Sequence, residues 1–210
     1  YPQTGTRKYD VIDYYLAVAD GMLPHLADRP ITRKRWPAGT GSGAFFEKSL
    51  PSGTPDWVAR FTIEHRGEEK VYPVASGAAD LVWLAQLAAL ELHVPQWRIA
   101  LSGDGERRTD RIVFDLDPGP EVPLSRCAEV AVTIREVLEA SGLTALPVTS
   151  GGKGIHVYAR LPAPVKSTSA AAVARQVAAD LAAADPAGIT DAMSREGRRG
   201  KVFIDWSQNN

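Results

Sequence analysis

Residues 111–117 of the 210-residue chain, RIVFDLD, decide the fold because apolar and polar side chains alternate along them. In an extended strand this alternation places Ile112, Phe114 and Leu116 on one face and Asp115 and Asp117 on the other. An amphipathic helix would instead repeat its apolar residues every three to four positions. The stretch therefore predicts a half-buried strand whose second face carries two carboxylates.

The segments that follow predict a complete sheet around this strand. After strand 111–117 we expect helix 124–141, strand 145–149, strand 154–161, helix 168–184 and strand 201–206. This order is the split β-α-β-β-α-β arrangement, in which the first and third strands are central and the fourth lies beside the first. Alternation then brings His156 and Asp205 to the helix-free face that carries Asp115 and Asp117. The sequence predicts an α+β fold with an RRM-like second half.

The first half of the chain predicts a mixed α/β structure. A helix is expected at 8–20, ending near Gly21, with one apolar face formed by Tyr9, Ile12, Leu16, Ala19 and Leu23. A loop rich in Gly and Pro follows, and then strand 60–65, helix 81–92 and strand 96–101. We expect a single catalytic domain with halves 1–105 and 106–210, the first packed on the open sheet face of the second.

Composition excludes several classes of protein. With 44% hydrophobic and 23% charged residues the chain has ordinary globular composition, and 24 basic against 25 acidic residues give a net charge of −1. The apolar stretch 81–92 is shorter than the roughly 20 residues of a membrane span, and no secretory signal is visible. A single cysteine, Cys127, cannot form an internal disulfide and predicts helix packing in a reducing, cytoplasmic compartment. Two basic clusters, 29–36 and 195–201, suit a phosphate ligand.

The carboxylates predict a metal site. Asp115 and Asp117 stand about 6–7 Å apart at the backbone, because they are two residues apart on one strand. Three clustered carboxylates raise one another's pKa unless a hard cation such as Mg²⁺ or Mn²⁺ binds them. Alone, an Asp-x-Asp at a strand end is equally compatible with a solvated turn. Asp205 on the neighbouring strand favours the metal.

The segment 150–156, SGGKGIH, predicts a phosphate-binding loop. Its glycines, among them Gly151 and Gly152, let a ligand approach the backbone, while Ser150, Lys153 and His156 supply donors. The loop departs from the Walker pattern, which requires Ser or Thr after the lysine. The alternative is a Gly-rich hairpin with a surface lysine.

Three features of the first half are candidate ligand contacts. His93 lies between an expected helix and an expected strand, where it could cap the helix or reach into a cleft. Phe45 and Phe46 follow a flexible Gly-rich segment and could stack on bases or anchor the loop in the core. The cluster from Arg33 to Arg35 is expected to follow a nucleic-acid backbone.

In this order, FDLDPG at 114–119, SGGKGIH at 150–156 and VFIDWSQN at 202–209 resemble the three motifs of the archaeo-eukaryotic primase-polymerase superfamily. Four further segments narrow the resemblance: residues 1–8, 32–37, 45–48 and 93–97. Together they resemble the polymerase domain of the bacterial non-homologous end-joining DNA ligase D and its stand-alone relatives. The resemblance covers nearly the whole chain. Because the domains of this family extend further at both ends, the chain is expected to be a fragment.

The resemblance implies roles for individual residues. It implies two divalent cations, Mn²⁺ or Mg²⁺, on Asp115, Asp117 and Asp205. It also implies triphosphate contacts from the 150–156 segment, a nucleotide pocket lined by Lys34 and His93, a downstream 5′-phosphate held by Lys8, and stacking of Phe46 on the template.

The activity implied is template-directed extension of primer 3′ ends with nucleoside triphosphates at DNA gaps and double-strand breaks. A ribonucleotide preference, the Ku end-binding protein, a ligase domain and a location at the bacterial nucleoid are implied with it. Two alternatives have other chemistry: a catalytically silent RRM-like nucleic-acid-binding module and a Mn²⁺-dependent glycosyltransferase. The first would place aromatic residues where this chain has carboxylates. The second would leave the third aspartate and the Ser-Gly-Gly-Lys segment unexplained.

Overall fold

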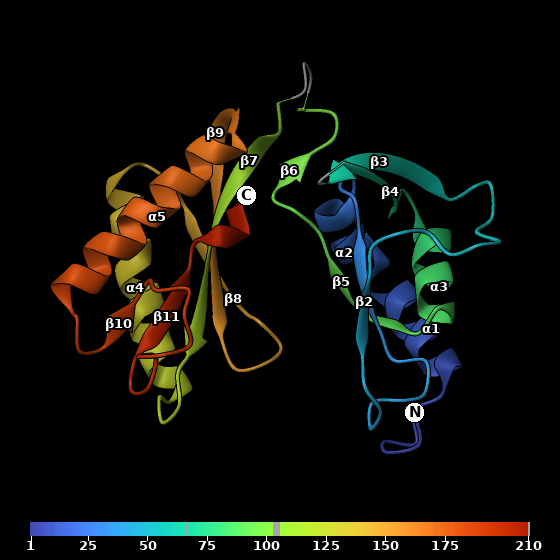
Figure 1. Cartoon of the computed structure of the whole chain (residues 1–210), viewed down its shortest axis with the longest axis horizontal. Coiled ribbons are helices and arrows are strands. Elements are labelled where there is room, and N and C mark those ends of the chain that lie inside the picture. Colours follow the sequence, from blue (N-terminus) through green and yellow to red (C-terminus); the bar gives the residue numbers. More distant parts are fainter. Residues whose placement is uncertain (66, 103–105, 210) are drawn as a thin grey trace. The chain divides into compact units, whose positions relative to one another are not determined.

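The computed structural model describes residues 1–65, 67–102 and 106–209. The chain forms two compact units, unit 1 from Tyr1 to Pro95 and unit 2 from Gln96 to Asn210, whose elements are labelled in Figure 1. The division expected near residue 105 lies outside the described residues, and the observed one falls about ten positions earlier. None of the helices in the described ranges combines the length and apolar character needed to cross a membrane.

Unit 2 contains the predicted split β-α-β-β-α-β. Its strands are β6 (Trp97–Arg98), β7 (Arg108–Pro118), β8 (Ala145–Thr149), β9 (Ile155–Lys166), β10 (Ile189–Thr190) and β11 (Val202–Asp205). They pair in the order β10-β11-β7-β9-β8, and β6 adds to β7. The helices are α4 (Leu124–Ala140) and α5 (Ser167–Ala184), and the short 3-10 helix η1 (Ser207–Asn209) follows β11. The first and third strands of the motif are central, as predicted.

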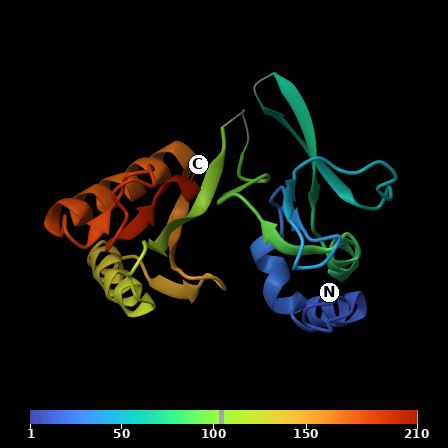
Figure 2. The same ribbon diagram turned by 60° about the horizontal axis from the view of Figure 1, so that its bottom comes forward.

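Alternation along β7 sorts its side chains as the sequence indicates. Ile112, Phe114 and Leu116 are fully buried in one apolar cluster with residues of α4 and α5, which cover the same face of the sheet in Figures 1 and 2. Cys127 belongs to this cluster, so its predicted packing role is confirmed. The opposite face of β7 carries the carboxylates.

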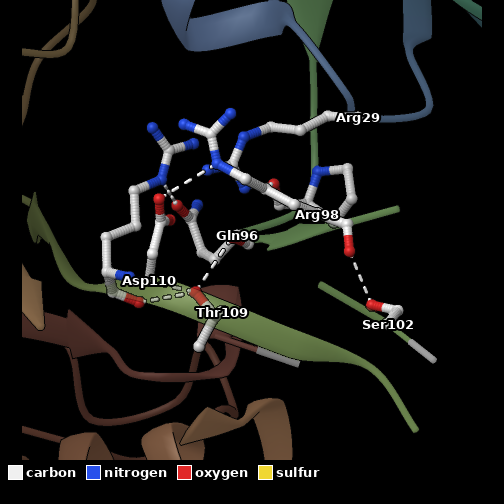
Figure 3. A network of polar contacts seen from close by, with 8 residues as sticks. Arg29, Gln96, Arg98, Ser102, Thr109 and Asp110 are labelled. Carbon is white, nitrogen blue, oxygen red and sulfur yellow. Dashed lines mark hydrogen bonds and ion pairs between the residues drawn. The ribbon is translucent and has the colours of Figure 1, made fainter. Parts of the chain in front are cut away.

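Polar contacts fasten the start of unit 2 to β7, as Figure 3 shows. The Thr109 hydroxyl donates to the backbone carbonyl of Gln96 at 2.9 Å, and Arg98 Nε donates to Asp110 at 3.0 Å. The Ser102 hydroxyl donates to the carbonyl of Arg98 at 2.6 Å. The strand predicted at 96–101 is therefore only the two-residue β6, which turns back at Ser102.

Unit 1 combines three helices with two small sheets. The helices are α1 (Lys8–Ala17), α2 (Ala19–Leu26) and α3 (Ala78–Gln86). A three-stranded sheet has the order β2-β1-β5, formed by β2 (Phe45–Glu47), β1 (Thr32–Arg35) and β5 (Ala89–His93). Strands β3 (Ala59–His65) and β4 (Glu68–Val74) form a separate hairpin. Strands β1, β2 and β4 were not predicted, and the first two lie in the segment expected to be a loop.

The helix predicted at 8–20 is wrong in its extent and in two of the five residues of its apolar face. Ile12, Ala19 and Leu23 do pack in the apolar cluster of unit 1. The chain breaks at Val18 into α1 and α2, and Gly21 lies inside α2. Tyr9 and Leu16 are exposed, whereas Tyr15 is buried and its hydroxyl donates to the carbonyl of Ala89 at 2.7 Å. The inward face therefore includes Tyr15 and excludes Tyr9 and Leu16.

The helix predicted at 81–92 is also wrong in its second half. Helix α3 ends at Gln86, Ala88 adopts a left-handed backbone with φ +55°, and residues 89–93 pair with β1. A continuous apolar run fits a buried helix and a buried strand equally well, so the sequence alone did not separate the two.

Candidate active site

The three aspartates lie on the helix-free face of the unit 2 sheet. Asp115 pairs directly with Asp205 on β11 and with His156 on β9, while Asp117 pairs with Phe203. Directly opposed residues in an antiparallel pair share one face of the sheet. Asp115, Asp117, Asp205 and His156, which we call the acidic face, are therefore brought together as the sequence predicts.

The charges of the acidic face perturb one another. Partial burial, followed by the charges of Asp115 and Asp205, raises the pKa of Asp117 above the ordinary value of an aspartate. The positive charges of Arg198 and His156 oppose this rise without cancelling it. The acidic face thus holds more negative charge than its own basic neighbours compensate.

His156 is held between a carboxylate and a phenol. Its Nε2 lies 3.2 Å from Asp115 Oδ1, and its Nδ1 lies 3.3 Å from the hydroxyl of Tyr158. The hydrogen bond to Asp115 raises the pKa of the imidazole, although burial alone would lower it. Since a carboxylate only accepts hydrogen bonds, the Nε2 atom carries the proton in this arrangement. Nothing in the motifs points to Tyr158 beyond its place on the same strand face.

Asp205 is oriented by the turn that follows it. Its Oδ1 accepts hydrogen bonds from the backbone N–H of Ser207 at 2.8 Å and from the Ser207 hydroxyl at 2.6 Å, and its Oδ2 accepts from Gln208 at 3.1 Å. Asn209, which is fully buried, forms two hydrogen bonds with the backbone of Val113 through its side-chain amide. Asn209 therefore continues the ladder of β11 along β7 after β11 has ended.

The predicted phosphate loop meets the end of β7 at backbone contact. A Cβ atom at Gly154 would stand 2.3 Å from the carbonyl oxygen of Leu116 and 3.4 Å from Asp117 Oδ1, so only glycine fits there. The Ser150 hydroxyl oxygen accepts from the N–H of Gly154 at 3.1 Å and of Gly152 at 3.3 Å, which folds the loop on itself. Gly151 has φ +78°, and Lys153 is exposed.

A second constellation occupies one face of the β2-β1-β5 sheet in unit 1. Lys34 pairs with Phe46 on one side and with Glu91 on the other. The ammonium of Lys34 lies 5.6 Å from the ring centroid of Phe46, and the His93 ring meets Phe46 edge-on at 5.3 Å. We call Lys34, Phe46, Glu91 and His93 the lysine-aromatic face. His93 ends β5 and does not cap a helix.

Arg33 and Arg35 point to the opposite face of β1, so the predicted DNA contact of Arg33 is wrong. Arg33 is fully buried, forms an ion pair with Glu47 at 3.1 Å, and lies 5.7 Å from the ring of Trp83. Arg35 donates to Glu47 at 2.9 Å and to the carbonyl of Leu87 at 2.6 Å. A guanidinium without exposed surface cannot reach a phosphate, and Arg35 is committed to the same internal network.

Three further candidates remain accessible. Phe45 and Phe46 are both exposed, which rules out the alternative that either ring anchors its loop in the core. The exposed Lys8 donates from Nζ to the carbonyl oxygen of Gln86 at 3.0 Å, at the C-terminal end of α3. A cation at this end of a helix is favourable, and two of its three N–H donors stay available to a ligand.

Comparison with known proteins decides the family. Residues 7–210 match the model described as LigD, primase-polymerase domain. The chain belongs to the LigD primase-polymerase family. The Mycobacterium tuberculosis protein named multifunctional non-homologous end joining DNA repair protein LigD is 51% identical over 213 residues, with 100% of this chain and 28% of that protein covered. The Mycolicibacterium smegmatis LigD is 48% identical and is covered to 27% of its length.

A solved structure extends the likeness to three dimensions. The structure titled polymerase domain from Mycobacterium tuberculosis ligase D in complex with DNA superimposes with a TM-score of 0.93 at 51% identity, covering 100% of this chain and 74% of that one. The predicted α+β primase-polymerase fold is thereby confirmed. This chain spans little more than a quarter of the length of the curated relatives.

Proposed function

We propose that this chain is a template-directed nucleotidyltransferase that extends primer 3′ ends at gaps and double-strand breaks in bacterial non-homologous end joining. The observation that carries the proposal is the acidic face, where three aspartates from two paired strands meet beside a Gly-rich loop. Membership of the LigD primase-polymerase family supports it, as do the end-joining names of the relatives and the DNA in the similar structure.

The acidic face suits a divalent cation by its donor chemistry. Its oxygens are hard ligands. The pKa of Asp117 is raised first by burial and then by the charges of Asp115 and Asp205, and a cation would offset those charges. Among the described residues, no three His, Cys, Asp or Glu side chains stand close enough to form a ready-made ligand set. We propose that Asp115, Asp117 and Asp205 hold two cations, Mn²⁺ or Mg²⁺. Such cations would lower the pKa of the attacking primer hydroxyl and neutralise the phosphates.

The residues around the acidic face have separate tasks in this proposal. The Ser150–Gly154 loop offers backbone N–H groups and Lys153 to the β- and γ-phosphates, with Gly151 and Gly152 allowing close approach. His156, protonated at Nε2 and oriented by Tyr158, donates to a phosphate oxygen or to Asp115. Electrostatic preorganisation of this kind stabilises the charge that develops on the phosphates during transfer.

Unit 1 supplies the remaining contacts in the proposal. Lys34 and His93 line the nucleotide site, while Phe46 and Phe45 present exposed rings on which bases stack. Lys8 holds a downstream 5′-phosphate. We no longer assign Arg33 to DNA, because it is buried in unit 1.

The cellular setting belongs to the same proposal. We propose nucleoside triphosphates and broken or gapped DNA as ligands, a ligase domain and the Ku end-binding protein as partners, and the bacterial nucleoid as the place of action. The preference for ribonucleotides is also proposed. A silent RRM-like module would stack bases on aromatic residues of its open face, whereas the acidic face would repel the phosphates of a nucleic acid in the absence of a cation.

Primer extension on gapped DNA tests the proposal. The protein should extend the primer with Mg²⁺ or Mn²⁺ and should fail with EDTA. It should bind the same DNA whether or not it can extend it. Binding without extension under every metal condition would favour the silent module instead.

A further inference from the structure

Glu91 carries a negative charge on the lysine-aromatic face, although a group that binds an anionic nucleotide would be expected to be positive. Its Oε1 lies 2.8 Å from Lys34 Nζ, and its Oε2 lies 2.9 Å from His93 Nε2. Each oxygen of one carboxylate thus holds one of the two side chains assigned to the nucleotide. The sequence motifs did not single out Glu91.

The backbone fixes Glu91 in this place. Lys34 and Glu91 are directly opposed on β1 and β5, and His93 follows Glu91 by two residues on the same face of β5. Partial burial alone would raise the pKa of Glu91, but the hydrogen bonds from Lys34 and His93 lower it. The carboxylate is therefore ionised and occupied on both oxygens.

The hydrogen bond with Glu91 also fixes which ring nitrogen of His93 carries the proton. Since a carboxylate only accepts, the proton of a neutral His93 ring resides on Nε2, and Nδ1 is left as an acceptor. Lys34 is held at the same time, with its ammonium 4.8 Å from the ring centroid of Trp36 and 5.6 Å from that of Phe46. A lysine side chain otherwise samples many rotamers, and this entropy is lost when a ligand binds.

We propose that Glu91 is a positioning residue of the nucleotide site, which pre-orients Lys34 and His93 beside Phe46 and so sets nucleotide affinity without contacting the reacting atoms. The proposal rests on the function proposed above, which gives Lys34 and His93 their ligand. A carboxylate near a triphosphate repels it, so loss of Glu91 would improve nucleotide use if its charge mattered only through repulsion.

The test is steady-state primer extension on gapped DNA with Glu91→Ala, Glu91→Gln and the control Glu69→Ala, an exposed glutamate on β4 of the same unit. Positioning predicts that Glu91→Ala raises the nucleotide KM about ten-fold and changes kcat by less than about two-fold. Glu91→Gln keeps an accepting oxygen for Lys34, so its KM should rise only about three-fold. The control should match the wild type. An unchanged or lowered KM in Glu91→Ala would overturn the proposal.

A second measurement does not depend on activity. The ¹⁵N resonances of the His93 ring, recorded in nucleotide-free protein, should shift in Glu91→Ala and stay in place in Glu69→Ala. Unchanged His93 resonances would overturn the positioning role even if the enzyme extends primers. Conversely, if the His93 resonances shift in Glu91→Ala but the wild-type protein extends no primer with either metal, the polymerase function is overturned and the geometry of Glu91 is left intact.

Discussion

The two units each present an open sheet face, but the faces carry opposite chemistry. The acidic face of unit 2 gathers three carboxylates with one histidine, and burial together with the charges of Asp115 and Asp205 raises the pKa of Asp117. The lysine-aromatic face of unit 1 combines a cation, an aromatic ring and a histidine with a single carboxylate, Glu91, that is bonded on both oxygens. The acidic face keeps uncompensated negative charge, whereas the charges of Lys34 and Glu91 cancel on the lysine-aromatic face.

The acidic face and the lysine-aromatic face require different ligands. In both, a histidine Nε2 meets a carboxylate, at 3.2 Å for His156 and 2.9 Å for His93. On the acidic face this pair leaves surplus negative charge, which calls for a cation before any phosphate can bind. On the lysine-aromatic face the charges already balance, which suits stacking and hydrogen bonding to a neutral part of a nucleotide.

The largest effect should come from removing a charge from the acidic face. Asp117→Asn should lower primer extension by about a thousand-fold, because a metal ligand is lost. DNA binding should persist, and the protein should be at least as stable as the wild type, since the substitution relieves repulsion. Extension rates, DNA affinity and thermal melting would be measured together. Glu136→Gln on the exposed side of α4 is the matched control. Normal extension by Asp117→Asn would remove Asp117 from the metal site.

A comparison of neighbours on β1 should separate stability from nucleotide use. Arg33→Ala should lower the free energy of unfolding by about 3 kcal/mol, because it leaves a cavity and strips Glu47 of one buried partner. Lys34→Ala should unfold at nearly the wild-type denaturant concentration but use nucleotide poorly. Chemical denaturation of both variants provides the measurement. A stable Arg33→Ala that binds DNA weakly would restore Arg33 to the DNA contacts.

Lys153→Ala should act through phosphate alone. A charge-assisted hydrogen bond to phosphate contributes about 1.5–3 kcal/mol, so nucleotide use should fall about ten- to a hundred-fold, equally for all four nucleotides. Lys153→Arg, which keeps the charge, should recover much of the loss. The measurement is kcat/KM for each nucleotide on matched templates. A defect confined to one base would show that Lys153 reads the base instead.

The smallest effect should appear in the pH dependence of stability in metal-free protein. The pKa of His156 is raised in the folded state, so its contribution is complete below the unfolded value of 6.5 and is lost as pH rises through the folded pKa. Stability should therefore decline as the pH rises above about 6.5, and His156→Gln should flatten this decline. Urea unfolding at several pH values in EDTA tests it. An identical slope in the variant would refute the assignment.

Much of unit 2 could be predicted because the residues that its sequence pattern assigns to the core are the ones that are buried. Alternation in residues 111–117 and 201–206 placed Asp115, Asp117 and Asp205 on one face without knowledge of side-chain contacts. Unit 1 was less predictable, since its strands are short and its apolar run at 81–92 fits two structures. The error for Arg33 has a single cause: a basic run was taken as one surface, although neighbouring residues on a strand face opposite ways. Glu91 and Tyr158 could not be found from motifs, because their importance lies in which partners the pairing of strands brings to them.

Two glycines near Asp117, Gly119 and Gly154, limit which residues the loops around it can carry. At Gly154 a Cβ would stand 2.3 Å from the carbonyl oxygen of Leu116, and at Gly119 it would stand 1.8 Å from the carbonyl oxygen of Arg198. Main chain therefore packs directly against both glycines. Over evolutionary time the tips of the 150–154 and 194–201 segments can exchange residues and retune their ligands, while these two positions tolerate no side chain. Evolution can thus change the residues that the loops present to a ligand, while the position of Asp117 stays the same.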